Sequence, residues 1–313
     1  MKLNRFFPAV LVVCSLFASA GTSAQTPQLT MAGYPAPGAP PTVTVASTGA
    51  GPKKALRYVI PAGQKATMEI NLKMGMSMNM AGMAMPMDMP GMKMTADAAV
   101  TQVDPNGDIT YTLAFTGLTI EAAADANPAV AAALQGAAAN ITSMKGTSTI
   151  SSRGVTKSAK MEVGDPTMQQ MLGQMTSTIE NLSNPFPEEA VGVGAKWEVR
   201  QAITSGGQTS FTKTEYELMA MDGNTVTLNT KMEQTAPPQS VSNPALPAGT
   251  EIALEKLSGT GTGTTKITLN SLVPTVEANS SINTSMVMSM GGATQPVTMD
   301  MTMKMTVGPG KVK

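Results

Sequence analysis

Residues 68–80 alternate strictly between apolar and polar side chains, and no other feature of the chain constrains its fold as strongly. The apolar positions are Met68, Ile70, Leu72, Met74, Met76, Met78 and Met80. The positions between them are Glu69, Asn71, Lys73, Gly75, Ser77 and Asn79. A period of two with one polar face predicts a half-buried antiparallel β-strand.

The methionines continue beyond this strand, in residues 83–94, but the backbone signal changes. Met83, Met85, Met87 and Met89 keep the alternation, whereas Pro86 and Pro90 interrupt it. Proline cannot donate a hydrogen bond to a neighbouring strand, so it is confined to sheet edges and bulges. We therefore expect a turn at Ala81-Gly82, followed by a loop, a lid or a frayed edge.

The rest of the chain reads mainly as β-structure. A second methionine-rich stretch, 281–307, predicts two more strands, and in the last of them Met299, Met301, Met303 and Met305 share one face. Two helices are expected. One is alanine-rich over 127–140, and the other begins at Asp165-Pro166 and carries the apolar stripe Met168, Met171, Leu172, Met175, Ile179 and Leu182. The predicted fold class is mainly β (α+β): one large curved antiparallel sheet or half-barrel, with one or two helices covering its apolar face.

The N-terminal segment suggests export. Residues 1–24 have a basic start, an apolar core and small residues at the cleavage point, as a secretory signal peptide does. Cleavage fits after Ala20 or after Ala24. Cys14 lies inside the apolar run, where a lipidated cysteine would not lie, so we expect no lipid anchor. Residues 25–52 read as a flexible Pro/Gly/Ala-rich tether, and 53–313 as a single β-rich domain. We expect a periplasmic or extracellular protein without a membrane span.

Composition removes many classes of function. The chain contains no histidine, and its one cysteine, Cys14, leaves with the signal peptide. A mature chain without either residue has no disulfide, thiol nucleophile, Ser-His-Asp triad or His/Cys zinc site. The 21 basic and 21 acidic residues of the full sequence are not clustered, which argues against nucleic-acid binding. "SGTGTGTT" (258–265) lacks phosphate-loop spacing and reads as a weakly packed strand or turn. We expect no enzymatic activity and no cofactor.

Four segments carry a resemblance. They are "LRYVIPAGQKATMEINLKM", "MKGTSTISSRGVTKSAKMEV", "PFPEEAVGVGAKWEV" and "SLVPTVEANSSINTSM". Together they resemble a family of exported bacterial proteins of unknown function, over about residues 55–307. More distantly, the pattern is similar to the periplasmic lipoprotein-carrier fold, a half-barrel that holds acyl chains. That similarity implies an apolar cleft, although this chain lacks an aromatic lining, and it assigns a role to no residue.

The methionines themselves support two hypotheses. Methionine is an adaptable apolar filler, and its regular alternation favours core or cleft lining. The expected cleft residues are Met74, Met76, Met78, Met286, Met288, Met301, Met303, Met171 and Met175. Thioethers are also soft ligands that suit Cu(I), and the proline-interrupted segment fits a core less well. The expected Cu(I) ligands are Met83, Met85, Met87, Met89, Met92 and Met94.

The sequence thus predicts an exported, non-enzymatic binding or carrier module. Its Met-lined apolar cleft would take a lipid or another apolar small molecule. The alternative is an exported Met-rich Cu(I)-binding protein that acts as a buffer or chaperone. The sequence leaves the oligomeric state and the identity of any ligand open.

Overall fold

The computed structural model describes most of the chain but not all of it. The described residues are 29–80, 83–121, 142–162, 185–205, 208–241, 250–290 and 293–310. The expected signal peptide and both expected helices lie outside these ranges, and Met171 and Met175 lie outside with them. Every element within the ranges is a β-strand.

The strands of the N-terminal part are β1 (Thr42–Ser47), β2 (Ala50–Lys54), β3 (Lys65–Met80), β4 (Met83–Asp88), β5 (Gly91–Val103), β6 (Ile109–Glu121), β7 (Lys145–Ile150) and β8 (Thr156–Glu162). Those of the C-terminal part are β9 (Val191–Val193), β10 (Lys196–Ser205), β11 (Gln208–Asp222), β12 (Thr225–Ala236), β13 (Gln239–Val241), β14 (Thr250–Thr268), β15 (Thr275–Met290) and β16 (Ala293–Pro309).

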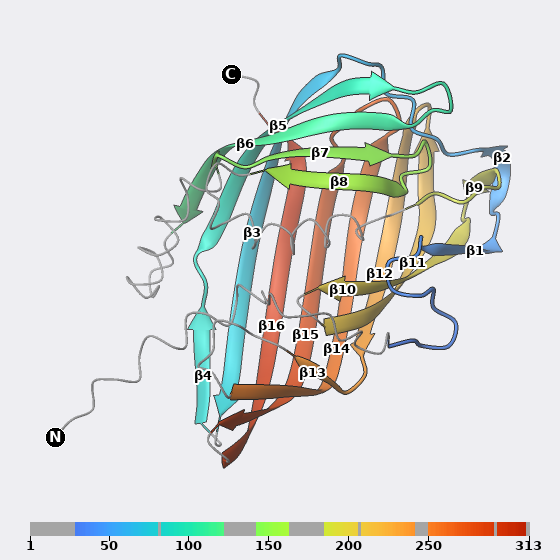
Figure 1. Ribbon diagram of the computed structural model, residues 1–313. Helices are drawn as coiled ribbons and strands as arrows, with labels where there is room; N and C mark the ends of the chain where they lie inside the picture. The colour runs from blue at the N-terminus through green and yellow to red at the C-terminus, as the bar shows by residue number, and fades with distance from the viewer. Residues whose placement is uncertain are drawn as a thin grey trace.

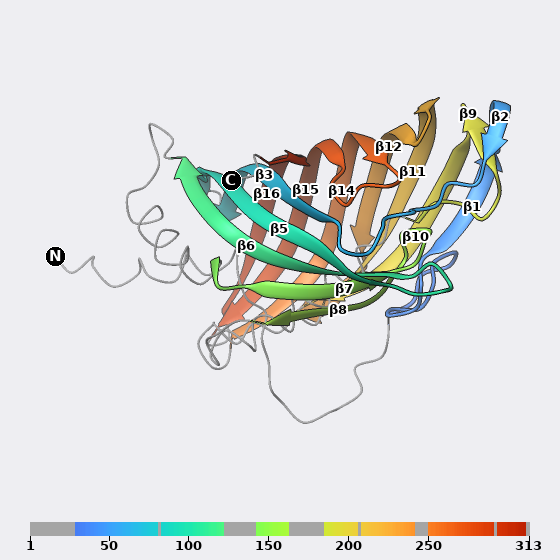
Figure 2. The same ribbon diagram turned by 90° about the horizontal axis from the view of Figure 1, so that it is seen from above.

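Fourteen of these strands form one antiparallel sheet. Twelve follow the order β1-β10-β11-β12-β14-β15-β16-β3-β5-β6-β7-β8, and the other two, β13 and β4, pair with β14 and β3. Two meanders of sequence neighbours, β3 to β8 and β10 to β16, meet where β16 pairs with β3. The sheet is strongly curved: β5 to β8 turn across the central strands on one side, and β10 and β1 turn on the other (Figures 1 and 2). The prediction of one large curved antiparallel sheet is confirmed, and the sheet is open rather than closed.

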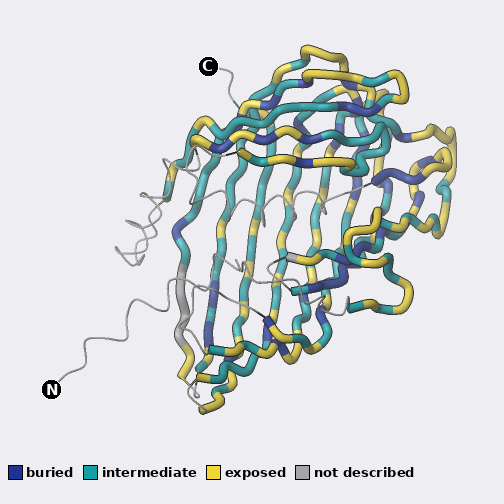
Figure 3. Tube along the Cα trace, in the orientation of Figure 1, coloured by how far each residue is buried: buried dark blue, intermediate teal, exposed yellow. Residues whose placement is uncertain are grey.

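One face of the sheet, here called the inner face, is apolar and shielded by this curvature. A row of directly paired residues crosses it through Leu218, Leu228, Thr265, Val276, Val307, Ile70, Met94 and Leu118. The largest core cluster lies on this face over β10 to β12, where Trp197 stacks on Tyr216 with ring centroids 5.4 Å apart. Such an aromatic pair adds about 0.5–1.5 kcal/mol to the area it buries. Burial alternates along the central strands, as a half-buried sheet requires (Figure 3).

The segment after β3 is a strand at its start, so the expected loop is wrong for residues 83–88. Here β4 runs back along β3, with Met85 opposite Met78, and β5 continues along the same edge, with Met92 opposite Leu72. The register slips by one residue between β4 and β5, around Pro90, which is buried. The slip accounts for the change from odd to even numbering in the methionines of this segment. The expectation of an edge holds, because β4 pairs only with β3 among the described residues.

The expected tether is also wrong where the structure describes it as strand. β1 pairs with β10 from Thr42 to Ser47, and β2 pairs with β9. Further upstream, the ring of Tyr34 meets Phe211 edge-on at 5.3 Å, and the guanidinium of Arg200 lies over Tyr34 at 5.4 Å. The alternation in "TVTVAS" was the signal for β1, but the surrounding prolines and glycines obscured it.

The turn between β5 and β6 gives a first testable prediction. Asp108 is buried and accepts hydrogen bonds from Asn106 and from Lys157 of β8. The Lys157 ammonium holds the pKa of Asp108 below its usual range. Its stabilising contribution is therefore complete above the unfolded-state pKa of about 4 and is lost as pH falls toward the lower folded-state pKa.

We expect Asp108→Asn to lower the free energy of unfolding at pH 7 by about 1–3 kcal/mol, because it weakens a charged hydrogen bond at a buried site. The variant should also lose less stability than the wild type below pH 4. Urea unfolding measured from pH 7 to pH 3 checks both effects. Glu162→Gln, which breaks the exposed Lys160–Glu162 pair, is the control and should behave as the wild type does.

Candidate functional site

The two methionine-rich stretches of the chain lie side by side on the inner face. β16 pairs with β3 so that Met303 is opposite Met74, Met301 opposite Met76, and Met299 opposite Met78. Directly opposed residues of an antiparallel pair have Cβ atoms about 5 Å apart and share a face. Sequence alternation predicted both strands but not their pairing.

The predicted cleft residues that the structure describes all face the same way. Met76 and Met78 are 8% and 6% exposed, and the others are half-buried. Met286 and Met288 continue the face on β15, and Met286 packs against the small apolar cluster of Ala236, Val241 and Leu254. The structure thus places Met74, Met76, Met78, Met286, Met288, Met301 and Met303 on one face, with Met288 eight residues along β15 from Ser280, which is level with Met74.

The six predicted metal ligands are divided between two places. Met83, Met85 and Met87 lie on β4, beside the last third of β3, and Met83 is 66% exposed. Met92 and Met94 lie on β5, opposite Leu72 and Ile70. Met89 lies between the two strands. The register therefore places β4 methionines next to those of β3, and the six do not form one group.

Three glycines of β14 and two small residues of β15 lie together on the inner face, and we call this part of the face the trough. Gly259, Gly261 and Gly263 lie opposite Ile282, Ser280 and Ala278. The trough has methionines on both sides, Met301, Met303 and Met305 of β16 and Met232 of β12. Neighbouring side chains lean over the glycines: the Met232 Cε atom would lie 3.2 Å from a Cβ at position 261. The alternating glycines of "SGTGTGTT" were the sequence signal for this trough, but on sequence alone they predicted only a weakly packed strand or turn.

The outer face of the same strands is polar. Lys213 forms ion pairs with Glu233 and Glu215 at 3.0 and 3.1 Å. Its hydrogen bond to Glu233 raises the pKa of Lys213. Threonines 260, 262 and 264 alternate with the glycines and are exposed on this side. Charge is thus kept off the inner face along the central strands.

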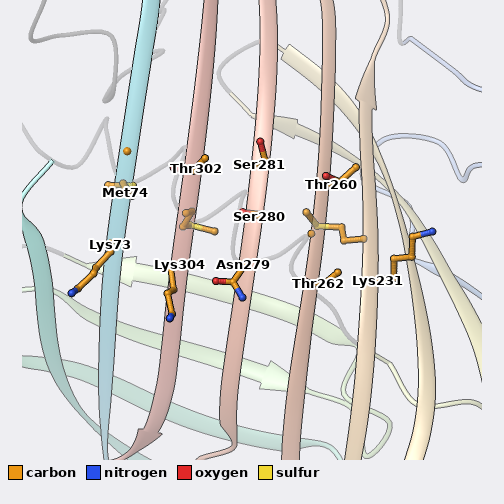
Figure 4. Close-up of a pocket in the computed structure, with 14 residues that line it drawn as sticks. Lys73, Met74, Lys231, Thr260, Thr262, Asn279, Ser280, Ser281, Thr302 and Lys304 are labelled. Carbon is orange, nitrogen blue, oxygen red and sulfur yellow. The ribbon is translucent and has the colours of Figure 1, made fainter. Parts of the chain in front are cut away.

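A hollow of about 580 Å³ lies over this polar face rather than in the methionine face. Two rows of outer-face residues border it, one with Lys73, Lys304 and Lys231 and the other with Thr302, Ser281 and Thr260 (Figure 4). Met74, Met303 and Met232 belong to the row between them. Because strand side chains alternate, these methionines contribute backbone to its floor. The hollow therefore does not correspond to the predicted apolar cleft.

The described ranges contain no cluster of three or more His, Cys, Asp or Glu side chains that could hold a metal ion. Tyr58 and Tyr216 are buried in the core, and burial raises the pKa of each phenol. Among the same residues, no helix is long and apolar enough to cross a membrane. The donors that do gather are thioethers.

Fold and site together define an open, curved antiparallel sheet with a methionine-lined inner face. The chain belongs to a family of unknown function (DUF6263), whose model matches residues 64–274. The match covers β3 to β14 and ends before β15 and β16. No match was found among curated proteins.

The glycine trough gives a second testable prediction. A Cβ at position 263 would lie 2.9 Å from the Glu277 carbonyl oxygen and 3.0 Å from Thr230 Oγ1. The carbonyl belongs to the neighbouring strand and cannot move aside as a flexible side chain can. We expect Gly263→Val to destabilise the protein by about 1–3 kcal/mol, as overpacking does. Urea unfolding checks it.

The adjacent substitution Thr262→Val provides the control, because it places the same side chain on the exposed outer face. It should change the free energy of unfolding far less. Equal stabilities for the two variants would show that the inner face has room at Gly263.

Proposed function

We propose that this protein is an exported, non-enzymatic binding or carrier module whose inner face holds a lipid-like ligand. The observation that carries the proposal is the trough of Gly259, Gly261 and Gly263, which has Met301, Met303 and Met305 of β16 on one side and Met232 of β12 on the other. Binding sites for apolar small molecules are concave and mostly apolar, with few polar groups.

Half-buried thioethers supply the driving force. Met301, Met303 and Met305 remain partly exposed, so an apolar ligand laid against them would remove apolar area from water. Each square ångström so covered contributes about 25 cal/mol. Methionine also has three rotatable bonds and a polarisable sulfur, which let it adapt to varied apolar shapes. The methionine walls therefore suit a class of ligands better than one rigid molecule.

The dimensions of the trough suit a slender ligand. Gly259 and Gly263 are four residues apart, or about 13 Å along the strand. β12 and β16 are three strand spacings apart, about 14 Å. Between them β14 carries the glycines and β15 carries Ser280 and Ala278, while Ile282 closes the end at Gly259. An alkyl chain laid along β14 would contact both walls.

The absence of enzymatic activity is part of the proposal. The inner-face positions of β3 from Ile70 to Met80 and of β16 from Val297 to Val307 are all uncharged. The chain has no histidine, and its one cysteine is Cys14. Such a face offers dispersion contacts and area burial rather than proton transfer or nucleophilic attack.

Two adjacent serines of β15 provide the test. Ser280 belongs to the inner face, beside Gly261 and Met303, and Ser281 to the exposed outer face. We expect Ser280→Glu to weaken binding of the apolar fluorophore N-phenyl-1-naphthylamine by about tenfold or more, because the ligand would have to desolvate a carboxylate. Ser281→Glu should bind as the wild type does. Fluorescence titration measures both.

Circular dichroism of each variant shows whether the sheet is intact. Equal binding by the two folded variants would contradict the proposal, as would failure of the wild type to bind the fluorophore. Protein purified under native conditions should also release apolar molecules on solvent extraction, detected by mass spectrometry, and these should be depleted in Ser280→Glu.

A further inference from the structure

We propose that Met76 and Met78 of β3, together with Met299 and Met301 of β16, form a binding site for Cu(I). We call these four residues the methionine square. The site goes beyond the proposed ligand-binding function and does not depend on it. It rests on the pairing of two strands far apart in the sequence.

The geometry of a sheet brings the four side chains together. Met76 is directly opposite Met301, and Met78 directly opposite Met299. Opposed Cβ atoms are about 5 Å apart, and residues i and i+2 are about 6.6 Å apart along a strand. The four Cβ atoms thus mark a rectangle whose centre is about 4 Å from each corner. Each sulfur is two bonds from its Cβ, so the four side chains can turn their sulfurs inward to ligate one ion held over the centre.

Burial distinguishes this part of the face from the rest. Met76 and Met78 are 8% and 6% exposed, the lowest values among the described methionines of β3 and β16. Neither belongs to the three apolar clusters found in the described part of the chain. The two opposed pairs therefore place four methionines at two neighbouring rungs of one strand pair, β3 and β16.

The donor set determines which ion would bind. Thioethers are soft, neutral ligands that favour Cu(I) over hard cations such as Mg²⁺ or Ca²⁺. The inner-face neighbours of the square are also uncharged: Met74, Met303, Met80, Val297, Ile282 and Thr284. Asp300 is adjacent in sequence, but it lies on the outer face and accepts a hydrogen bond from Asn283 at 2.6 Å. With no carboxylate on the inner face to neutralise the ion, a monovalent ion is favoured and the affinity is modest.

The test is anaerobic titration of the purified full-length protein with Cu(I), in competition with a chromophoric Cu(I) chelator. We expect the wild type to take up one equivalent of Cu(I). Replacing the square by leucine (Met76→Leu, Met78→Leu, Met299→Leu, Met301→Leu) should lower the affinity by about tenfold or more, because leucine keeps the volume but has no donor. X-ray absorption of the wild-type complex should show sulfur neighbours only.

A matched control changes four other methionines of the inner face, all half-buried: Met232→Leu, Met286→Leu, Met288→Leu and Met305→Leu. This variant should keep the wild-type affinity. The proposal would be overturned by three results: unchanged uptake in the folded square variant, equal loss in the control, or nitrogen or oxygen neighbours in the absorption spectrum.

A third variant tests whether Cu(I) binds at the methionine square or in residues 83–94, the segment that the sequence predicted. Met83→Leu, Met85→Leu, Met87→Leu and Met89→Leu together should leave the site bound with wild-type affinity. Loss of uptake in this variant, with uptake retained in the square variant, would move the site to β4 and overturn the assignment. Binding of N-phenyl-1-naphthylamine, measured on the same samples, reports the ligand proposal separately.

Discussion

The pairing of β16 with β3 holds the two halves of this molecule together. Each half is a meander whose strands pair with near neighbours in sequence, and such local contacts cost little loop-closure entropy. The β16–β3 seam is different, since it joins residues 68–80 to residues 297–309. Its inner-face pairs are almost wholly Met, Ile, Leu and Val. At one end, the Gln64 side chain donates to the Asn270 carbonyl and accepts from the Leu272 amide, which ties the meanders together again.

The sequence predicted which residues share a face of the sheet better than it predicted which strands pair. A period of two showed that Met74, Met76 and Met78 share a side, and likewise Met299, Met301 and Met303, because alternation is a local property of strands. It could not show that the two sets are opposed, since register is decided between strands and not within one. The same limit explains the divided metal candidates: residues 83–94 are continuous in sequence, but a one-residue slip near Pro90 sends Met85 and Met92 to different parts of β3.

The loop expected at residues 83–88 and the tether expected at residues 42–52 were wrong for the same reason. Proline and glycine in these segments indicate a break in the strand, but pairing with neighbouring strands overrides this local preference. Pro86 is accommodated because β4 is an edge among the described strands. β1 forms because β10 offers a complete row of backbone partners from Lys196 to Arg200. The glycines of β14 alternate along the strand, so three consecutive inner-face positions carry no side chain. The sequence alone could not show which residues lie beside them, because Ile282, Ser280 and Ala278 are placed there by the pairing of β14 with β15.

A seam built from thioethers also has a redox chemistry that an aliphatic seam would lack. Oxidation of methionine gives a sulfoxide, which is polar and chiral and disrupts packed apolar contacts. At Met76 or Met78, where little water can reach the new dipole, this change would fall on the junction between the meanders rather than within either of them. The reduction of such a sulfoxide is enzymatic and requires access to it. Oxidising surroundings would therefore weaken the packing between the two meanders through these few sulfur atoms.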